Sequence, residues 1–100
     1  MVRGYIPERG DIVWLLFEQK QGHEQRGRRP ALVLSERGYN GLTGLAVVCP
    51  ITSVFKGYTF AIETHGNKVH GSVLADQVQS AAWRERRARF FVFIPGSTLA

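Results

Sequence analysis

Short hydrophobic runs separated by glycine-containing turns extend along the whole chain. These runs are rich in β-branched residues and are bounded by turn-forming residues, which is typical of strands. In residues 58–64, apolar and polar side chains alternate as they do in a strand with one buried face. The strands predicted in this way are residues 12–17, 31–35, 45–50, 58–64, 71–76 and 90–94.

The segments between these runs predict little helix. Residues 18–29 form a polar stretch, and a loop of that length in a compact domain is usually functional or disordered. Residues 37–40 predict a helical turn, whereas periodicity leaves residues 77–83 open between a short strand and a helix. Short strands at these spacings favour a small, strongly curved barrel or sandwich, with residues 1–100 forming one domain.

Two further turns are predicted near the end of the chain. Residues 66–68, between His65 and His70, are typical of a hairpin tip, where solvated histidines are the simpler expectation. Residues 95–98 have the pattern of a helix start, with Ser97 or Thr98 as the N-cap.

Composition excludes several classes of protein. With 44% hydrophobic and 21% charged residues, the chain has the composition of a soluble globular domain rather than a disordered tail. No apolar run approaches the roughly 20 residues that a membrane span requires, and the N-terminus lacks the apolar region of a signal peptide.

The single cysteine, Cys49, excludes an internal disulfide and a cysteine-based zinc site, and we expect it to be buried in a strand. The cytoplasm is the expected compartment.

The net charge of +5 comes mainly from arginine. Arginine binds phosphate through a planar fork of donors and stacks on bases, whereas lysine acts more as a point charge. Three arginines fall within residues 26–29 and four within residues 84–89. Two such clusters in a chain that also contains two tryptophans and three tyrosines favour a nucleic acid as the partner.

Four segments in order resemble the MazF/PemK family of toxin ribonucleases, including its Kid-like members. The most characteristic is G-x-E-Q-x-G-x-R-P-x-x-V-L-S at residues 22–35. It is preceded by G-D-I-V-W at 10–14 and followed by V-C-P-I-T-S at 48–53 with K-G-Y at 56–58. The fourth segment is G-S-V-L-A-D-Q-V at 71–78, continuing to A-W-R at 82–84. The similarity covers about residues 5–87.

This resemblance implies a small SH3-like barrel of mostly antiparallel strands. It also implies a cytoplasmic homodimer with an RNA groove along the subunit interface, which a MazE-like antitoxin would occupy. The family usually closes with a C-terminal helix, and because this chain ends at Ala100 we expect that helix to be short or missing.

The implied activity is that of a sequence-specific, metal-independent endoribonuclease that blocks translation and growth. In such cleavage the ribose 2′-OH of single-stranded RNA attacks the adjacent phosphate, giving 2′,3′-cyclic phosphate and 5′-OH ends. No cofactor and no metal are expected. The sequence agrees with this, because it contains only two aspartates and no His-x-x-x-His or paired acidic motif.

Arg29 and Thr52 match the family's catalytic arginine and threonine. The guanidinium of Arg29 can donate two hydrogen bonds to phosphate oxygens and stays charged, so it is a strong stabiliser and a poor general base. The Thr52 hydroxyl can both donate to and accept from a phosphate oxygen. The simpler alternatives are a surface arginine before a strand and a threonine that bonds locally to the backbone.

Three residues compete for the role of general base. His23 titrates near neutrality, and some Kid-like members have a histidine in the same Gly-His-Glu-Gln context. Glu24 is an equal candidate, because an acidic residue here is implicated in part of the family. Asp76 ranks third, since the Kid-like branch pairs it with an arginine where this chain has Leu74. The structural alternative for Asp76 is that it caps a turn or pairs across the barrel.

Further residues are candidates for contacts to RNA. Phe55 is the best exposed aromatic candidate, because it lies in a connecting segment between Thr52 and Lys56. The other aromatic candidates, residues 17, 39, 58 and 83, are mostly expected in the core. The candidate contacts to phosphate or bases are Gln25, Arg28, Phe55, Lys56, Asp76, Gln77, Arg84 and Arg86.

Two other functions remain as alternatives. CcdB-like toxins share the barrel but bind DNA gyrase, and they depend on a C-terminal Trp-Gly-Ile that this chain lacks. An inactive SH3-like module would bind RNA with strong salt dependence and release no products. The sequence does not identify the recognised bases, the main target RNA or the antitoxin.

Overall fold

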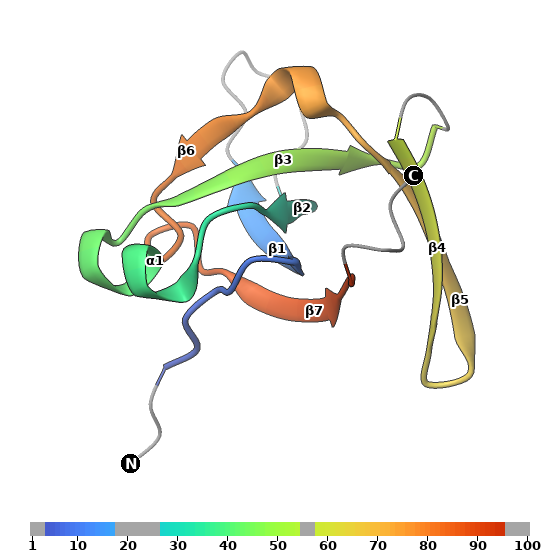
Figure 1. Cartoon of the computed structure of the whole chain (residues 1–100), viewed down its shortest axis with the longest axis horizontal. Helices are drawn as coiled ribbons and strands as arrows, with labels where there is room; N and C mark the ends of the chain where they lie inside the picture. The colour runs from blue at the N-terminus through green and yellow to red at the C-terminus, as the bar shows by residue number, and fades with distance from the viewer. Residues whose placement is uncertain (1–3, 18–26, 55–57, 96–100) are drawn as a thin grey trace.

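Seven antiparallel strands form one strongly bent sheet in the computed structural model, which describes residues 4–17, 27–54 and 58–95 (Figure 1). The strand order is β4-β5-β3-β2-β1-β7, and β6 also pairs with β3. The fold confirms the predicted small barrel of antiparallel strands with little helix. The strands are β1 (Asp11–Phe17), β2 (Gly27–Val33), β3 (Ala46–Thr52), β4 (Tyr58–Thr64), β5 (Asn67–Val73), β6 (Gln79–Ala81) and β7 (Arg89–Phe93).

Strand β3 joins the two halves of the sheet because it changes partners along its length. Val48 lies opposite both Val33 of β2 and Gln79 of β6, so these two strands flank β3. The ladder with β2 ends at Pro50, and the last two residues of β3 pair with β5 instead. A hydrogen bond of 2.9 Å from the Leu74 N–H to the Pro50 carbonyl lies on the same edge of β3 as the pairing with β5. Strands β2 and β3 therefore diverge beyond Pro50.

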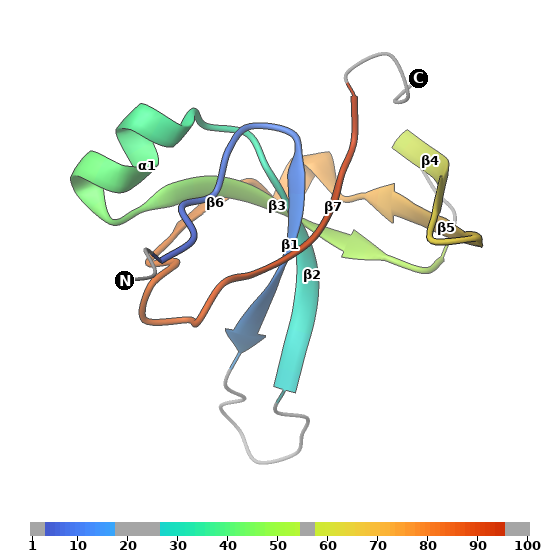
Figure 2. The same ribbon diagram turned by 90° about the horizontal axis from the view of Figure 1, so that it is seen from below.

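The β4–β5 hairpin lies at the opposite end of the molecule from the helix α1 (Arg37–Thr43) (Figures 1 and 2). Its two-residue turn consists of His65 and Gly66, with φ values of 49° and 79°. Two-residue hairpin turns require such positive φ values, because only then does the twist of the turn match that of the strands. At the base of the hairpin, the lack of a side chain at Gly71 allows the side chains of Ile51 and Phe60 to lie close to its backbone. A Cβ atom there would lie 2.9 Å from both Ile51 Cγ2 and Phe60 Cζ.

Two hydrophobic clusters lie on the two faces of the bent sheet. Successive side chains of a strand point to opposite faces, and Ile12 and Val13 accordingly belong to different clusters. One cluster contains Val13, Leu15, Ala31, Val33, Ala46, Val48, Ala81 and Trp83. The other extends under the hairpin and contains Ile12, Leu32, Cys49, Phe60, Val73, Val92 and Ile94.

Helix α1 is anchored by the fully buried side chain of Asn40. The Asn40 amide donates to the carbonyls of Pro7 at 2.9 Å and Ser35 at 3.0 Å, and its oxygen accepts from the Ser35 hydroxyl at 2.5 Å. The indole N–H of Trp83 donates to the Asn40 carbonyl at 2.9 Å. The helix ends at Gly44, whose φ of 76° is readily available to glycine. The helical turn predicted at 37–40 is thus correct but too short.

The structure corrects several predicted boundaries. The strand predicted at 31–35 begins at Gly27, because residues 28–30 pair with hydrophobic β1 despite their polar sequence. The strand predicted at 71–76 begins at Asn67, because the hairpin turn lies at 65–66 rather than 66–68. Residues 75–77 form a 3-10 helix, and β6 follows, so the open segment 77–83 contains a short strand. The helix start predicted at 95–98 lies outside the described residues, apart from Pro95. The expectation of a short or missing C-terminal helix also falls on residues outside that part of the chain.

Candidate functional site

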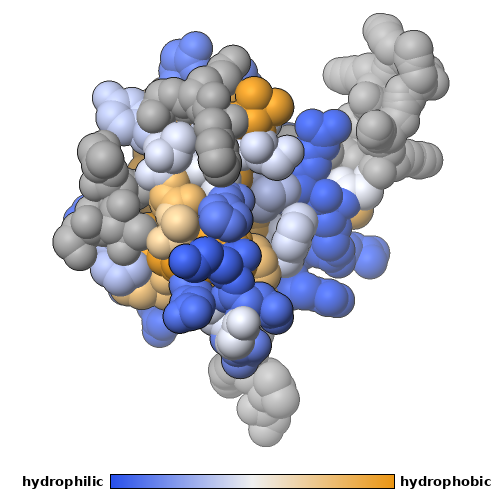
Figure 3. All heavy atoms as spheres, turned by 90° about the vertical axis from the view of Figure 1, so that its right-hand side faces the viewer, coloured by the Kyte–Doolittle hydropathy of each residue, from blue (hydrophilic) through white to orange (hydrophobic). Residues whose placement is uncertain are grey.

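A cavity of about 430 Å³ separates the β4–β5 hairpin from the strands β1, β2 and β7. The tilted rings of Trp14 and Phe91, with centroids 5.1 Å apart, form part of its wall. Thr52 and Ser53 line it from the end of β3. Seen from the hairpin side, the molecule carries apolar surface bordered by hydrophilic side chains (Figure 3). The remaining lining residues are Ile12, Pro30, Ile51, Phe60, Val69 and His70.

Thr52 is the sequence-predicted catalytic residue that lies at this cavity. It is the last residue of β3 and lies directly opposite Ser72 of β5, which in turn lies opposite Thr59 of β4. Its hydroxyl accepts the N–H of Val54 at 3.2 Å, which is the local backbone bond considered as the alternative role. A hydroxyl that accepts one hydrogen bond still has its own hydrogen to donate, so Thr52 can also donate to a ligand at the cavity.

Arg29 lies on β2 with an exposed side chain, next to the cavity residue Pro30. In the β2–β3 ladder, Ala31 lies opposite Pro50. Continuing that register would place Arg29 opposite Thr52, at the level where the two strands diverge. The two residues chosen from the sequence therefore lie on adjacent strands at the same level of the sheet.

The two arginine clusters of the sequence meet at the far end of β1 and β2. The guanidinium of Arg28 donates to the Arg87 carbonyl at 3.0 Å, and the Leu16 N–H donates to the Arg86 carbonyl at 2.8 Å. These bonds hold the segment after Trp83 against the β1–β2 pair. Tertiary contacts thus bring together two arginine-rich segments that lie almost 60 positions apart in the chain.

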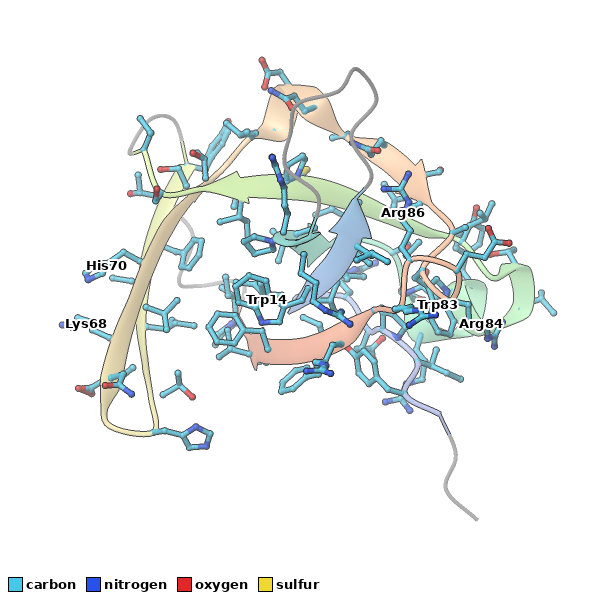
Figure 4. All side chains as sticks on the ribbon, turned by 180° about the vertical axis from the view of Figure 1, so that it is seen from behind. Trp14, Lys68, His70, Trp83, Arg84 and Arg86 are labelled. Atoms are coloured by element: carbon cyan, nitrogen blue, oxygen red, sulfur yellow. The ribbon has the colours of Figure 1, made fainter. Side chains whose placement is uncertain are left out.

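Arg84 lies elsewhere. Its guanidinium carbon is 4.5 Å from the centroid of the Trp83 ring, and a terminal nitrogen lies beside Gly44 at the end of α1. Figure 4 places Arg84 and Trp83 at the end of the molecule away from His70 and Lys68. Arg84 therefore does not belong to the cavity beside Thr52.

Asp76 and Gln77 lie in the 3-10 helix Ala75–Gln77 with exposed side chains. This helix follows Leu74, which bonds to Pro50 on the edge of β3 that does not face β2. Asp76 and Arg29 consequently lie on opposite sides of β3.

Other sequence-predicted residues lie outside the described part of the chain: His23, Glu24, Gln25, Phe55 and Lys56. Within the described part, no three His, Cys, Asp or Glu side chains are grouped so that they could hold a metal ion. No helix of the described residues has the length and hydrophobicity that a membrane crossing requires.

The other expectations for the aromatic and cysteine residues have mixed outcomes. Cys49 is buried, as predicted, and burial raises the pKa of its thiol. Trp83 is a core residue, but Tyr39 and Tyr58 are 46% and 54% exposed, so the prediction that most of these aromatics are buried is wrong for both tyrosines.

The sequence interpretation missed Trp14 and His70 as residues of the cavity. His70 was placed beside a turn, but it lies inside β5, and Figure 4 shows it on the same side of that strand as Lys68. The sequence did contain a signal for a strand at His70, because the small or apolar residues 69, 71 and 73 alternate with polar residues 68, 70 and 72. For Trp14 the strand was predicted, but its neighbours across the sheet were unknown.

Comparisons with known proteins agree on one family. Residues 8–100 match the family model described as PemK-like, MazF-like toxin of type II toxin–antitoxin system. The endoribonuclease toxin MazF of Escherichia coli K12 is 47% identical over 88 residues, which cover 88% of this chain and 79% of that protein. The endoribonuclease toxin ChpB of the same strain is 41% identical, covering 89% and 81%.

Solved structures show the same similarity. A crystal structure of a MazE–MazF complex (form II) from Deinococcus radiodurans superposes with a TM-score of 0.80 at 48% identity. The match covers 95% of this chain and 86% of the other. Form I of MazF from the same organism gives a TM-score of 0.74, also at 48% identity, with 95% and 87% covered.

Proposed function

The chain belongs to the family of PemK-like, MazF-like toxins of type II toxin–antitoxin systems and is an endoribonuclease toxin, and from this premise we propose that it cuts single-stranded RNA without a metal ion. The ribose 2′-OH attacks the adjacent phosphate, and the products carry a 2′,3′-cyclic phosphate and a 5′-OH. Cleavage of messenger RNA in this way blocks translation and growth.

Arg29 stabilises the charge that develops on the phosphate. The attack produces a pentacoordinate phosphorus with additional negative charge on its oxygens, and preorganised donors lower the energy of that state. The guanidinium supplies two parallel N–H groups and remains protonated throughout. Thr52 donates its hydroxyl hydrogen to a phosphate oxygen, while its own oxygen accepts the Val54 N–H at 3.2 Å.

The observation that carries this proposal is the alignment of Arg29 and Thr52. Extending the β2–β3 register brings both residues to the same level, where the strands separate and leave the cavity beside Thr52. Both residues sit on strands, which hold catalytic groups more rigidly than loops. A phosphate placed between the two strands would meet a charged donor from β2 and a hydroxyl from β3.

The proton of the attacking 2′-OH goes to His23 or Glu24, which stay equal candidates for the general base. A histidine base predicts a limb in the pH–rate profile near its ordinary pKa of about 6.5, and a carboxylate base predicts one near about 4.3. We expect one of these limbs to disappear in His23→Ala or in Glu24→Gln. A limb that persists in both variants would exclude both residues, and Asp76→Asn would be the next variant.

The family also suggests the assembly. A cytoplasmic homodimer of single-domain protomers would bind RNA in a groove that a MazE-like antitoxin also occupies. The crystal structure of a MazE–MazF complex from D. radiodurans supports a MazE-like partner. The contacts to RNA would come from Gln25, Arg28, Phe55, Lys56, Asp76, Gln77, Arg84 and Arg86.

Because the chain has a net charge of +5, its RNA groove should attract an acidic antitoxin segment that folds on binding. An acidic peptide of this kind is expected to slow cleavage, and failure to compete with RNA would contradict a shared groove.

The experiment that tests the proposal is cleavage of a mixed-sequence single-stranded RNA in EDTA. The wild type should give cyclic-phosphate ends, Arg29→Ala should give none, and Thr52→Val should be slower. The matched control is Arg37→Ala, because Arg37 is an exposed arginine on α1 at the other end of the molecule. Removal of a single oxyanion donor typically costs about 100- to 1,000-fold in rate. Turnover of folded Arg29→Ala near the wild-type rate would refute the catalytic role.

RNA binding without products in the wild type would instead favour an inactive binding module. No RNA binding at all would make gyrase inhibition the next assay.

A further inference from the structure

We propose that Arg28 is a positioning residue for catalysis. By donating to the Arg87 carbonyl, its guanidinium holds the start of β2 in place and so keeps Arg29 at the phosphate that is cut. The inference rests on the proposed function, because it concerns the placement of the arginine that would stabilise the reacting phosphate. The role is separate from a contact to RNA, since Arg28 acts here through Arg29.

The start of β2 has a strand partner on one edge only in the described part of the chain. β1 pairs with β2 from Gly27 to Leu32, whereas the ladder with β3 covers only residues 31–33. Figure 2 shows the end of β1 and the start of β2 extending together away from β3. Segments with few neighbours open locally more easily than the core. A catalytic group must be held within about 0.5 Å of its productive position, so Arg29 needs a further support at this end of the strand.

The side chain of Arg28 supplies such a support by bonding to a third segment. Its guanidinium donates to the Arg87 carbonyl at 3.0 Å. Arg28 lies opposite Leu16 of β1, and the Leu16 N–H donates at 2.8 Å to the carbonyl of Arg86, on the other edge of β1. The Arg28 side chain therefore crosses β1 and connects β2 to the segment beyond it. A hydrogen bond from a charged donor is stronger than one between neutral groups.

The carbonyl that accepts this bond is itself held firmly. The Ala88 N–H donates to the Trp83 carbonyl at 2.9 Å, and Arg87 has a φ of 52°, which is the pattern of the Schellman motif that ends a helical turn. Trp83 is buried, and its indole N–H donates to the Asn40 carbonyl at 2.9 Å. Arg28 thus connects the start of β2 to the core of the protein.

Arg28 and Arg29 point to opposite faces of the sheet, because successive side chains of a strand alternate. Arg29 shares its face with Ala31 and Val33, which belong to one hydrophobic cluster. Arg28 shares its face with Leu32, which belongs to the other. A phosphate bound by Arg29 consequently lies away from the side chain of Arg28. Loss of Arg28 would reach that phosphate only through the backbone of β2.

The first test separates positioning from RNA binding. We measure kcat for cleavage of single-stranded RNA at saturating concentration in EDTA, and Kd for the same RNA in a non-cleavable 2′-O-methyl form, with the wild type and Arg28→Ala. The matched control is Arg87→Gly. It removes one arginine from the same surface but keeps the carbonyl that accepts the Arg28 bond, and glycine readily adopts a φ of 52°.

The expected result for Arg28→Ala is a fall in kcat of about 10- to 100-fold, beyond any change in Kd, because a misplacement of about 1 Å can cost about 100-fold in rate. Arg87→Gly should keep the wild-type kcat. A wild-type kcat for Arg28→Ala, with a slope of log Kd against log salt that is smaller by about 0.7, would assign Arg28 to a single phosphate contact and overturn the proposal. Equal losses of kcat in both variants would also overturn it, because charge would then be responsible.

A second test uses amide hydrogen exchange and needs no RNA. The Val33 carbonyl accepts the Gly10 N–H, so the backbone groups of Val33 point to the β1 side. By alternation the N–H of Arg29 also points to β1, opposite Leu15. In Arg28→Ala the exchange of the Arg29 amide should accelerate by about 10-fold or more, the factor that one hydrogen bond from a charged group is typically worth. Exchange at Val33 should not change. An unchanged rate at Arg29 would refute the support by Arg28.

The two tests distinguish failure of this inference from failure of the proposed function. If the wild type cleaves no RNA, the proposed function fails, while hydrogen exchange still decides whether Arg28 holds the start of β2. If exchange at Arg29 accelerates but kcat stays at the wild-type value, the bond supports the strand without serving catalysis, and the positioning role is refuted.

Discussion

The buried amide of Asn40 offers the sharpest test of what holds the fold together. The side chain is 0% exposed and makes three hydrogen bonds, to the Pro7 carbonyl, the Ser35 carbonyl and the Ser35 hydroxyl. Asn40→Ala removes all three and leaves the two carbonyls without this donor. At about 1 kcal/mol for each hydrogen bond, the expected loss in the free energy of unfolding is about 3–4 kcal/mol. That is a large share of the roughly 5–15 kcal/mol of a typical domain.

Denaturant unfolding at one fixed protein concentration measures this loss, with the fluorescence of buried Trp83 as the probe. The melting temperature should fall by roughly 12–30 °C, since 1 kcal/mol shifts a domain of this size by about 4–8 °C. Asn40→Asp should be at least as harmful, because it places a carboxylate oxygen against two carbonyl oxygens.

The matched control for Asn40 is Leu42→Ala in the same helix. Leu42 is 87% exposed, so its truncation should change the free energy of unfolding by less than about 0.5 kcal/mol. A folded Asn40→Ala protein within 1 kcal/mol of the wild type would refute the role assigned to the three hydrogen bonds, and so would equal losses in the two variants.

Two further predictions follow from the packing. Burial, together with the hydrogen bond to the Asp11 carboxylate, raises the pKa of Tyr5, so the stability due to the neutral phenol is present below about pH 10 and falls as the pH rises above it. Tyr5→Phe should lose stability less steeply in alkaline titrations, and an unchanged slope would contradict this. Gly71→Ala places a methyl group 2.9 Å from Ile51 and Phe60 and should lower the free energy of unfolding by about 1–3 kcal/mol, whereas an unchanged melting curve would show that the hairpin can move aside.

Local patterns in the sequence predicted most of the strands and the mainly β class. The prediction for β4 is correct at both ends, because alternation over residues 58–64 directly reflects one buried and one exposed face. The start of β2 was missed, because Gly27, Arg28 and Arg29 form a strand through pairing with β1 rather than through their own preference. The hairpin turn was predicted at 66–68 but lies at 65–66, and the strand after it was predicted to begin at 71 rather than at 67, so the prediction left His70 outside β5.

The candidate site was only partly predictable for the same reason. Arg29 and Thr52 were chosen from motifs, and the structure places them on neighbouring strands. Trp14 was not chosen, because only its contact with Phe91 and its place in the wall of a cavity formed by segments far apart in the chain bring it to the site. Arg84 was chosen from its place in a basic cluster, yet its guanidinium packs on Trp83 at the other end of the molecule.

The sequence by itself determined which residues are strand-forming, how strongly basic the chain is and which family motifs it carries, because each of these is a property of neighbours along the chain. Only the tertiary structure decided that β3 leaves β2 for β5 after Pro50, which opens the cavity beside Thr52. It also decided that the two arginine clusters meet through Arg28 and Arg87. Alternation specifies which face of a strand is buried, but the partner strand is selected by long-range backbone pairing and packing, which no local pattern encodes.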